Sequence, residues 1–158
     1  MDVTIGVTRL DDQAPLPSYA HDDDAGADLA TMTDLVIEPG ERVVASTGIA
    51  VAIPEGYAGF VHPRSGLAAR HGLTMVNSPG VIDAGYRGEI KVCLINTDPR
   101  TPIHLKRGDK VAQMVIQAVA HAQFAEVESL PGSQRGSGGY GSSGGVAAWG
   151  PTTPKGQE

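Results

Sequence analysis

Hydrophobic and polar residues alternate along several short runs of the chain. The clearest alternation involves Ile49, Val51 and Ile53, and the run VAQMVIQAV at residues 111–119. Successive side chains of a strand point to opposite faces of a sheet, so this period predicts strands. Runs with strand character are residues 3–7, 42–45, 48–53, 59–62, 89–96, 103–105 and 111–119. Many short strands separated by Gly- and Pro-rich turns predict an all-β sandwich, jelly roll or barrel.

A single short helix is expected at residues 65–71. Ser65 can cap its first turn, residues 67–70 favour helix, and Gly72 can end it. No other stretch of ten or more residues shows the 3.6-residue period of an amphipathic helix.

The chain changes character near Leu130. Between residues 131 and 150, eight of twenty residues are Gly and four are Ser. Such a segment buries too little apolar surface to offset the entropy that ordering costs, so its simplest interpretation is a flexible tail. Arg135 and Tyr140 argue for a further role, because a pure linker needs neither.

The composition limits the class of protein. The chain has 158 residues, of which 41% are hydrophobic and 19% charged, so one domain with a folded core is expected. A formal net charge of −6 argues against general nucleic-acid binding, which needs a basic surface. The lone Cys93 excludes an internal disulfide and a multi-cysteine zinc site. Without a signal-like start or a long apolar run, we expect a cytoplasmic protein with no membrane segment.

The segment PRSG at residues 63–66 comes directly before the expected helix. Unpaired N–H groups at a helix start suit phosphate oxygens, and Arg64, the Ser65 hydroxyl and Gly66 would lie beside them. An ordinary serine cap with a solvated arginine explains the same four residues. Taken alone, the segment favours this plainer interpretation.

The segment at residues 81–89 lies between two strand-like runs and indicates a β-hairpin turn. Asp83 can stabilise that turn through a hydrogen bond, or it can act as a general base that orients water beside a flat wall formed by Tyr86. Asn77, expected on the incoming strand, offers an amide that can read the edge of a base. Each of these residues also has the plain role of a turn residue.

Four aspartates, Asp22, Asp23, Asp24 and Asp28, form an acidic cluster. The cluster can hold a hydrated Mg²⁺, which usually takes one or two carboxylates together with substrate phosphates. A solvated acidic loop explains the same residues.

Five segments occur together in one order, namely DAGADL at 24–29, PRSGLA at 63–68, GVIDAGYRGEI at 80–90, RGDKVAQ at 107–113 and RGSGGYGSSGG at 135–145. Together they resemble the five motifs of the trimeric deoxyuridine triphosphatase (dUTPase) family, from about residue 3 to residue 145. The resemblance implies an all-β fold, a distorted jelly-roll sandwich or barrel with one short helix, assembled as a homotrimer with active sites at subunit interfaces. It also implies hydrolysis of dUTP to dUMP and pyrophosphate with Mg²⁺, which limits uracil in DNA and supplies dUMP for thymidylate synthesis.

The resemblance assigns roles on the nucleoside side of the site. Asp83 is implied to be the base that directs water at the α-phosphorus. Tyr86 is implied to pack on the deoxyribose and to exclude a 2′-hydroxyl. The groups implied to bind uracil and the 3′-hydroxyl belong to Asn77, Val81, Ile82 and Asp83.

On the phosphate side, the implied contacts come from Arg64, Ser65, Gly66 and Gln113. Lys91 matches a position that lines the substrate site in part of the family. Asp28 matches the acidic position near the metal, where it would hold Mg²⁺ through water.

The resemblance divides the chain into a β domain at residues 1–130 and a mobile glycine-rich lid at residues 131–145. The lid is implied to close over the γ-phosphate and the base with Arg135, Tyr140, Gly141 and Ser142. Family members usually have Phe, sometimes His, where this chain has Tyr140. Residues 146–158 lie outside the fifth motif and are expected to form a disordered tail.

Two alternatives remain open at this point. A dCTP deaminase has a related fold and acts on cytosine without zinc, although the hairpin around Asp83 resembles the phosphatase version. A non-catalytic trimeric nucleotide-binding or regulatory protein would bind dUTP and release no pyrophosphate. The expected partners are the nucleotide and further copies of the chain, with neither nucleic acid nor a membrane.

Overall fold

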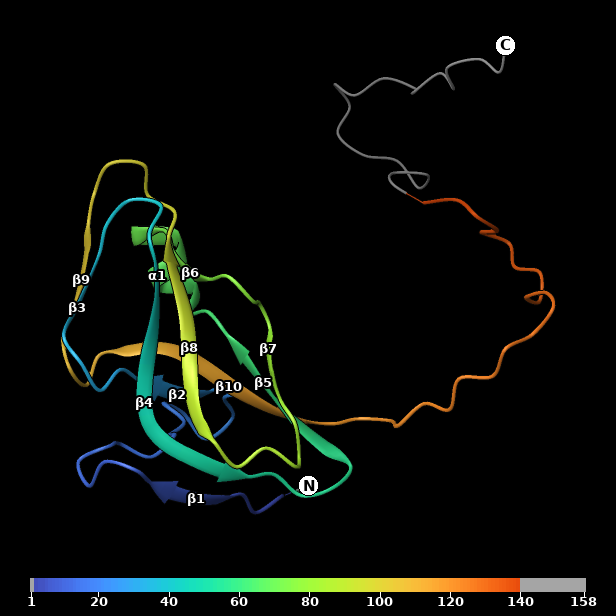
Figure 1. The fold of residues 1–158 in the computed structure, drawn as a ribbon, viewed down its shortest axis with the longest axis horizontal. Helices are drawn as coiled ribbons and strands as arrows, with labels where there is room; N and C mark the ends of the chain where they lie inside the picture. Colours follow the sequence, from blue (N-terminus) through green and yellow to red (C-terminus); the bar gives the residue numbers. More distant parts are fainter. Residues whose placement is uncertain (1, 140–158) are drawn as a thin grey trace, which may run out of the picture. The chain divides into compact units, whose positions relative to one another are not determined.

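The computed structural model describes residues 2–139 of the chain. The chain divides into two units, Met1–His121 and Ala122–Glu158. The first unit holds every strand and the one helix of the described residues (Figure 1). No helix among residues 2–139 is both long and apolar enough to cross a membrane.

Three antiparallel sheets build the first unit (Figure 1). The first sheet has the order β1 (Gly6–Arg9), β4 (Arg42–Ala52), β8 (Glu89–Asn96), β6 (Leu73–Met75). The second has the order β2 (Ala27–Ala30), β10 (Lys110–Ala118), β5 (Tyr57–His62), β7 (Gly80–Ile82). The third pairs β3 (Leu35–Ile37) with β9 (Ile103–Leu105). The predicted all-β jelly-roll sandwich with one short helix is confirmed.

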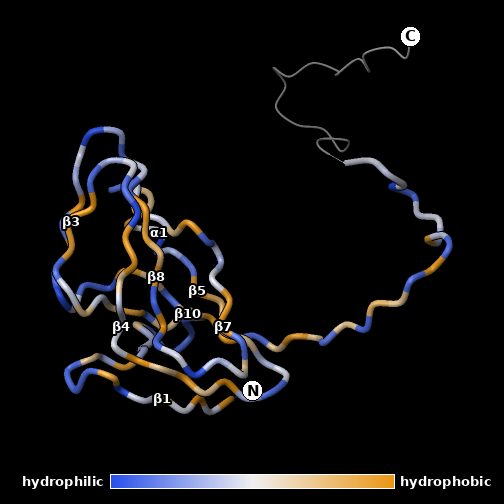
Figure 2. Tube along the Cα trace, in the orientation of Figure 1, coloured by the Kyte–Doolittle hydropathy of each residue, from blue (hydrophilic) through white to orange (hydrophobic). Residues whose placement is uncertain are grey.

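The core follows from the alternation seen in the sequence. In β8, Ile90, Val92 and Leu94 are completely buried, whereas the residues between them are at least partly exposed. Burial of each such side chain contributes about 1.5–3 kcal/mol. Hydrophilic residues gather in the loops that join β3 to β4 and β8 to β9 (Figure 2). These loops are connected by backbone bonds, because Gly40 N–H donates to the carbonyl of Asn96 over 2.9 Å.

Most predicted strands lie at or near their predicted positions, but several strands were not predicted. Residues 89–96 and 103–105 are strands with the predicted bounds, and the predicted strand at 111–119 begins and ends one residue earlier. The strand expected at residues 3–7 is instead β1, Gly6–Arg9. Four strands were missed, β2, β3, β6 and β7, which are only three or four residues long and too short to show a period.

The two runs predicted at residues 42–45 and 48–53 form one strand, β4. Its pairing with β8 shifts register between Ser46 and Ala50, which marks an irregularity at Gly48. Gly48 has a φ of +69°, and a Cβ there would lie 2.9 Å from the Cβ of Ala14. Glycine therefore lets the strand continue through the irregularity without a clash.

The helix α1 has the predicted bounds, Ser65–His71, but a different start. Arg64 is its N-cap residue and no side chain caps it, so the prediction that Ser65 caps the helix was wrong. Ser65 is already in the first turn. Gly72 ends the helix as predicted, with a left-handed φ of 67°.

The sequence suggested a β-hairpin at residues 81–89. This prediction was wrong, because the strands on either side of the segment do not pair with each other. Strand β7 pairs with β5 in the second sheet, whereas β8 pairs with β4 and β6 in the first. The turn that carries Asp83 therefore connects two sheets. Asn77 does not lie on a strand either, because it belongs to the bend between β6 and β7.

The described part of the second unit, residues 122–139, contains no helix or strand. Hydrophobic residues recur along it (Figure 2), and Phe124, Val127 and Leu130 are 98%, 58% and 84% exposed. Further along, Gly136 N–H donates to the carbonyl of Ser133 and Gly138 N–H to that of Arg135, which makes two consecutive turns.

Candidate active site

Three neighbouring strands bring part of the predicted site together at the start of α1. Gln113 of β10 pairs with Asp28 of β2 on one side and with His62 of β5 on the other. Arg64 follows directly on β5. These residues belong to a pocket of about 500 Å³, called here the α1 pocket. Its lining consists of Ala20, Asp24, Ala25, Gly26, Asp28, Arg64, Ser65, Gly66, Leu67, Arg70, His71 and Gln113.

Asp28 of the α1 pocket forms ion pairs with two cations. Its carboxylate lies 3.0 Å from Nε of Arg64 and 2.7 Å from Nζ of Lys110, and its side chain is only 10% exposed. Arg64 also donates from Nη1 to the carbonyl of Lys110 over 3.2 Å. Two cations beside one carboxylate leave a local excess of positive charge around Asp28, which suits an anionic group.

Gln113 is held in a fixed orientation at the floor of the pocket. Its Nε2 donates to the carbonyl of Pro63 over 3.0 Å, so its amide oxygen faces Gly26. A Cβ on Gly26 would overlap this oxygen. The glycine in the DAGADL segment is therefore needed for the close approach of two strands.

Ser65 and Gly66 are exposed at the entrance of the α1 pocket. The Ser65 hydroxyl makes no hydrogen bond within residues 2–139, and a Cβ on Gly66 would meet no atom within 4 Å. The polar groups at this end of α1 thus face open space in which a ligand fits.

The other predicted residues form a separate pocket of about 430 Å³, called here the turn pocket. It includes all six residues predicted for the nucleoside side and the strand after it. Its lining consists of Val61, Met75, Asn77, Gly80, Val81, Ile82, Asp83, Tyr86, Glu89 and Lys91.

Local hydrogen bonds fix the turn that carries Asp83. Tyr86 N–H donates to the carbonyl of Asp83 over 3.0 Å, which closes a tight turn. The Tyr86 hydroxyl donates to the carbonyl of Glu89, also over 3.0 Å, and Arg87 donates from Nη1 to the carbonyl of Ala84. The aromatic ring is consequently held in place, although 44% of the residue remains exposed. Asp83 lies at the tip with its side chain exposed.

The turn pocket offers unpaired polar groups. The Asn77 side chain makes no hydrogen bond within residues 2–139. Strand β7 is the edge of its sheet and pairs only with β5, so the backbone groups of its other edge are free for a ligand. Lys91 lies 3.5 Å from a carboxylate oxygen of Glu89, whose other oxygen accepts the Gly48 N–H over 3.0 Å.

The two pockets have no lining residue in common. Within one chain, Asp83 and Arg64 therefore belong to different pockets. Arg135 lies in the second unit, where its Nε donates to the carbonyl of Gly138 over 2.8 Å. Tyr140, Gly141 and Ser142 lie outside the described residues.

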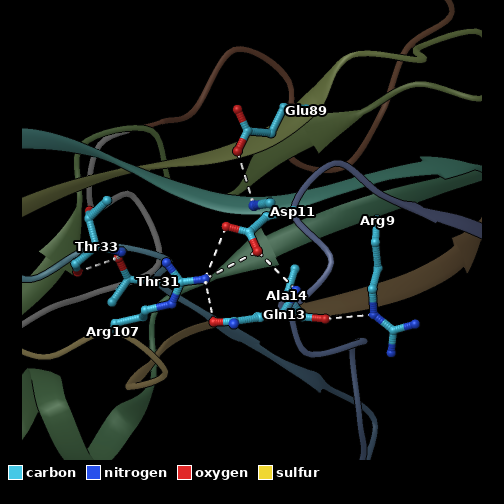
Figure 3. A network of polar contacts seen from close by, with 9 residues as sticks. Arg9, Asp11, Gln13, Ala14, Thr31, Thr33, Glu89 and Arg107 are labelled. Atoms are coloured by element: carbon cyan, nitrogen blue, oxygen red, sulfur yellow. Dashed lines mark hydrogen bonds and ion pairs between the residues drawn. The ribbon is translucent and has the colours of Figure 1, made fainter.

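A polar clamp between Arg107, Asp11 and Gln13 holds the turn between β9 and β10 (Figure 3). Nη2 of Arg107 lies 3.0 Å and 3.1 Å from the two carboxylate oxygens of Asp11 and 3.3 Å from Oε1 of Gln13. The backbone N–H of Arg107 donates to Asp34, which also accepts from Lys106 Nζ over 2.8 Å. The clamp positions Lys110, at the start of β10, beside Asp28.

Hydrogen bonds from backbone N–H groups and from charged side chains shift the pKa values of several of these residues. The N–H of Gln13, followed by the Arg107 side chain, lowers the pKa of Asp11. The Lys106 ammonium lowers the pKa of Asp34, which in turn raises the pKa of Lys106. In the α1 pocket, the backbone N–H of His21 lowers the pKa of Asp24 and keeps that carboxylate ionised.

Among residues 2–139, no group of three or more His, Cys, Asp or Glu side chains is arranged to hold a metal ion. The α1 pocket nevertheless contains two carboxylates, Asp24 and Asp28, and Mg²⁺ takes one or two carboxylates when phosphates and water complete its shell. Oxygen ligands of this kind fit a metal that arrives with its substrate. Of the acidic cluster, Asp22 and Asp23 do not line the pocket.

Sequence reasoning missed Lys110, which pairs with Asp28, and several residues that line the two pockets. Lys110 belongs to the quoted RGDK segment, yet nothing local shows that it pairs with Asp28. Glu89 was named only as the end of the turn. Arg70 and His71 were placed on the helix, but no spacing rule indicates that they line a pocket. The usable signal was Gly26, because a glycine between two aspartates next to a strand suggests a close backbone approach.

Comparisons with known proteins agree with this arrangement. The dUTPase family model matches residues 12–144. The deoxyuridine 5′-triphosphate nucleotidohydrolase of Thermobifida fusca is 64% identical over 146 residues, which cover 92% of this chain and 82% of that protein. The enzyme of the same name from Nocardia farcinica is 60% identical over 144 residues, covering 91% of this chain and 87% of that one.

The solved structures that resemble this chain are also dUTPases. A point mutant of the Staphylococcus bacteriophage 80alpha dUTPase with dUpNHpp has a TM-score of 0.82 at 30% identity, covering 89% of this chain and 98% of that one. A mutant dUTPase from phage phi11 of S. aureus, described with a structural Mg(II) ion, has a TM-score of 0.74 at 30% identity, with coverages of 80% and 98%. By its sequence, its fold and its five ordered motifs, this chain belongs to the dUTPase family.

Proposed function

We propose that this protein hydrolyses dUTP to dUMP and pyrophosphate, with Asp83 directing a water molecule at the α-phosphorus. The observation that carries the proposal is the turn pocket, in which an exposed carboxylate stands beside a fixed aromatic ring, an unpaired amide and a free strand edge. The matched relatives named deoxyuridine 5′-triphosphate nucleotidohydrolase support the substrate.

Recognition of uracil follows from the free edge of β7. Backbone N–H and C=O groups of Val81 and the amide of Asn77 can pair with the polar edge of the base. Cytosine reverses a donor and an acceptor on that edge, so it would leave polar groups unpaired and bind more weakly.

Discrimination of the sugar follows from Tyr86. Its ring is held by the bond to the Glu89 carbonyl and cannot swing away without breaking it. A deoxyribose packs against such a flat face, whereas a 2′-hydroxyl needs space and a polar partner.

The chemical step needs a water molecule in line with the α-phosphorus and neutralised phosphate oxygens. Asp83 accepts a proton from the attacking water as a general base. The bond between the α-phosphorus and the bridging oxygen breaks, and pyrophosphate leaves. Arg64, Ser65, Gly66 and Gln113 bind the phosphate oxygens, and each hydrogen bond to a charged group is worth about 1.5–3 kcal/mol.

Asp28 would hold Mg²⁺ through water beside the triphosphate. When bound, Mg²⁺ neutralises charge on the phosphate oxygens and favours departure of the leaving group. Before the substrate arrives, Arg64 and Lys110 occupy the same carboxylate.

The proposal includes a homotrimer, because one chain keeps Asp83 and Arg64 in separate pockets. We propose that the turn pocket of one subunit meets the α1 pocket of a neighbour. Large apolar side chains support assembly, since Phe124 and Leu130 of the second unit are 98% and 84% exposed and Val44 on the outer face of β4 is 62% exposed. Residues 131–145, with Arg135, Tyr140, Gly141 and Ser142, would close over the bound triphosphate.

The decisive experiment is pyrophosphate release from dUTP, dTTP, dCTP and UTP, with and without Mg²⁺. We expect rapid release from dUTP only, and a loss of at least 100-fold without Mg²⁺. Asp83→Ala should bind dUTP and lose most turnover, while Asp12→Ala, another exposed aspartate in a turn, should keep it. Ammonia from dCTP would identify a deaminase, and dUTP binding without pyrophosphate release would identify a regulatory protein.

A further inference from the structure

A third cavity of the first unit is lined mostly by residues that have no part in the proposed reaction. Its volume is about 790 Å³, larger than either site pocket. It lies between the helix α1, the loop from β8 to β9, the strand β9 and the turn that leads into β10. We call it the β9 cavity, because Ile103, His104 and Leu105 of β9 form one of its walls.

The β9 cavity shares a wall with the α1 pocket. Arg64, Leu67, Arg70 and His71 line both spaces. An anion in the α1 pocket is therefore separated from the β9 cavity only by side chains of Arg64 and of the helix. Of the two arginines in this wall, Arg64 is held by Asp28, whereas Arg70 makes no hydrogen bond or ion pair within residues 2–139 and can turn from one space to the other.

Two cations that line the β9 cavity, Arg64 and Lys110, are paired with Asp28, and the two carboxylates of the cavity accept backbone N–H groups. Oδ1 of Asp98 accepts the N–H groups of Arg100 and Thr101 over 2.8 Å and 2.7 Å, and these bonds lower the pKa of Asp98. Oδ2 of Asp109 accepts the N–H of Lys106 over 2.7 Å.

By contrast, the side chains of Arg70, His71 and His104 have no hydrogen-bond or ion-pair partner within residues 2–139. All three residues are exposed. Arg70 and His71 come from the last turn of α1, where basic residues also face the negative end of the helix. The three side chains converge on one cavity from two different elements. A compact ligand with several negative charges can pair with the Arg70 guanidinium and accept hydrogen bonds from the N–H groups of the two imidazoles.

We propose that the β9 cavity is a second anion-binding site, which takes pyrophosphate after it leaves the α1 pocket. This inference rests on the proposed function, which produces pyrophosphate on the other side of the shared wall. Arg70, which lines both spaces, would keep the leaving anion paired with a cation as it crosses the shared wall. No covalent step is involved.

His104 offers the cleanest test, because it lines the β9 cavity and not the α1 pocket. We would measure the binding of pyrophosphate to the full-length assembled protein by equilibrium dialysis with Mg²⁺ present. The variants are His104→Glu, which adds a negative charge, and His104→Gln, which only removes the imidazole. His121→Glu is the control, because His121 is an exposed histidine outside every pocket described above.

We expect two pyrophosphate molecules per chain in the unchanged protein and in His121→Glu, and one in His104→Glu. His104→Gln should weaken the second site about tenfold. Initial rates with dUTP and no added pyrophosphate should stay within twofold in all variants.

One pyrophosphate per chain in the unchanged protein, or two in His104→Glu, would overturn the proposal. Displacement of the His104-dependent pyrophosphate by saturating dUMP would overturn it too, because the cavity would then take nucleotides. Failure of the unchanged protein to release pyrophosphate from dUTP would instead count against the proposed function, so the two failures can be told apart.

Discussion

Nε of Arg64 lies 3.0 Å from Oδ1 of Asp28, and the other oxygen of this carboxylate lies 2.7 Å from Nζ of Lys110. The arginine that we assign to phosphate binding is thus oriented before any phosphate is present. Such orientation lowers the entropy that substrate binding would otherwise cost.

Asp28→Asn should therefore reduce kcat/KM for dUTP by about 10- to 100-fold, because Arg64 loses its orientation and Mg²⁺ loses a charged ligand. The Mg²⁺ concentration that gives half the maximal rate should rise in the same assay. Both ion pairs involve partly exposed cations, so the free energy of unfolding should fall by only about 1 kcal/mol. Asp22→Asn is the matched control, and an unchanged Mg²⁺ dependence in Asp28→Asn would remove Asp28 from the metal site.

Tyr86→Ala should lower the preference for dUTP over UTP. The ratio of the two kcat/KM values should fall about tenfold, because the wall that excludes a 2′-hydroxyl is removed. The ratio for Tyr86→Phe should lie between those of the unchanged protein and Tyr86→Ala, since phenylalanine keeps the ring and loses only the bond to the Glu89 carbonyl. Tyr19→Phe, at another exposed tyrosine, should change nothing, and an unaltered ratio in Tyr86→Ala would contradict the assignment.

Gly26→Ala should weaken substrate binding without unfolding the protein. The new Cβ would displace the Gln113 amide and break its bond to the Pro63 carbonyl. We expect KM for dUTP to rise about tenfold and the free energy of unfolding to fall by about 1 kcal/mol. Gly6→Ala is the control, because a Cβ there makes only an ordinary contact of 3.5 Å. Normal kinetics in Gly26→Ala would show that the Gln113 amide has no role in binding.

Asn96→Leu should be strongly destabilising. Asn96 is completely buried, and its Nδ2 donates to the carbonyls of Ile37 and Thr101 while its Oδ1 accepts the N–H of Asp98. Leucine would leave three backbone groups without partners, so we expect a loss of about 3 kcal/mol in urea unfolding. Gln117→Leu, at an exposed position of β10, should lose under 0.5 kcal/mol.

The pair between Asp34 and Lys106 should make stability depend on pH at both extremes. The lowered pKa of Asp34 contributes stability above the ordinary pKa of an aspartate, about 3.9, which is lost as the pH falls through the lower value in the folded protein. The raised pKa of Lys106 contributes stability below about pH 10.4, which is lost as the pH rises through its higher folded value.

The measurement is the urea midpoint of Asp34→Asn relative to the unchanged protein at pH 2, 7 and 12. The difference should be greatest at pH 7 and shrink towards both extremes. Glu55→Gln, in the exposed turn between β4 and β5, should show no such profile. A difference that stays constant across the range would mean that Asp34 acts through something other than its charge.

Local signals predicted the fold well wherever an element was long enough to show one. The run predicted at residues 89–96 has the bounds of β8, and Gly72 marks the end of α1 as predicted. The missed strands β3, β6 and β7 have three residues each, so they depend on pairing partners far away in the chain. Turn residues around Asp83 indicated a reversal of direction, but they carry no information on which sheet each flanking strand joins.

The site was predicted as a set of residues and not as a geometry. Spacing alone left Asp83 as a plausible turn residue and Arg64 as a solvated arginine beside a serine cap, and only the order of the motifs grouped them. The pairing of Asp28 with Lys110 depends on the register between β2 and β10, which no local pattern specifies. That Asp83 and Arg64 lie in two separate pockets became visible only in the three-dimensional structure.

The separation of the two pockets has a genetic consequence. If neighbouring subunits share each site, a chain defective at Asp83 and a chain defective at Arg64 complement each other. Each homotrimer of one defective chain is inactive, whereas every mixed trimer pairs an intact turn pocket with an intact α1 pocket at one of its three interfaces. Two inactive alleles expressed in the same cell would then restore part of the lost activity.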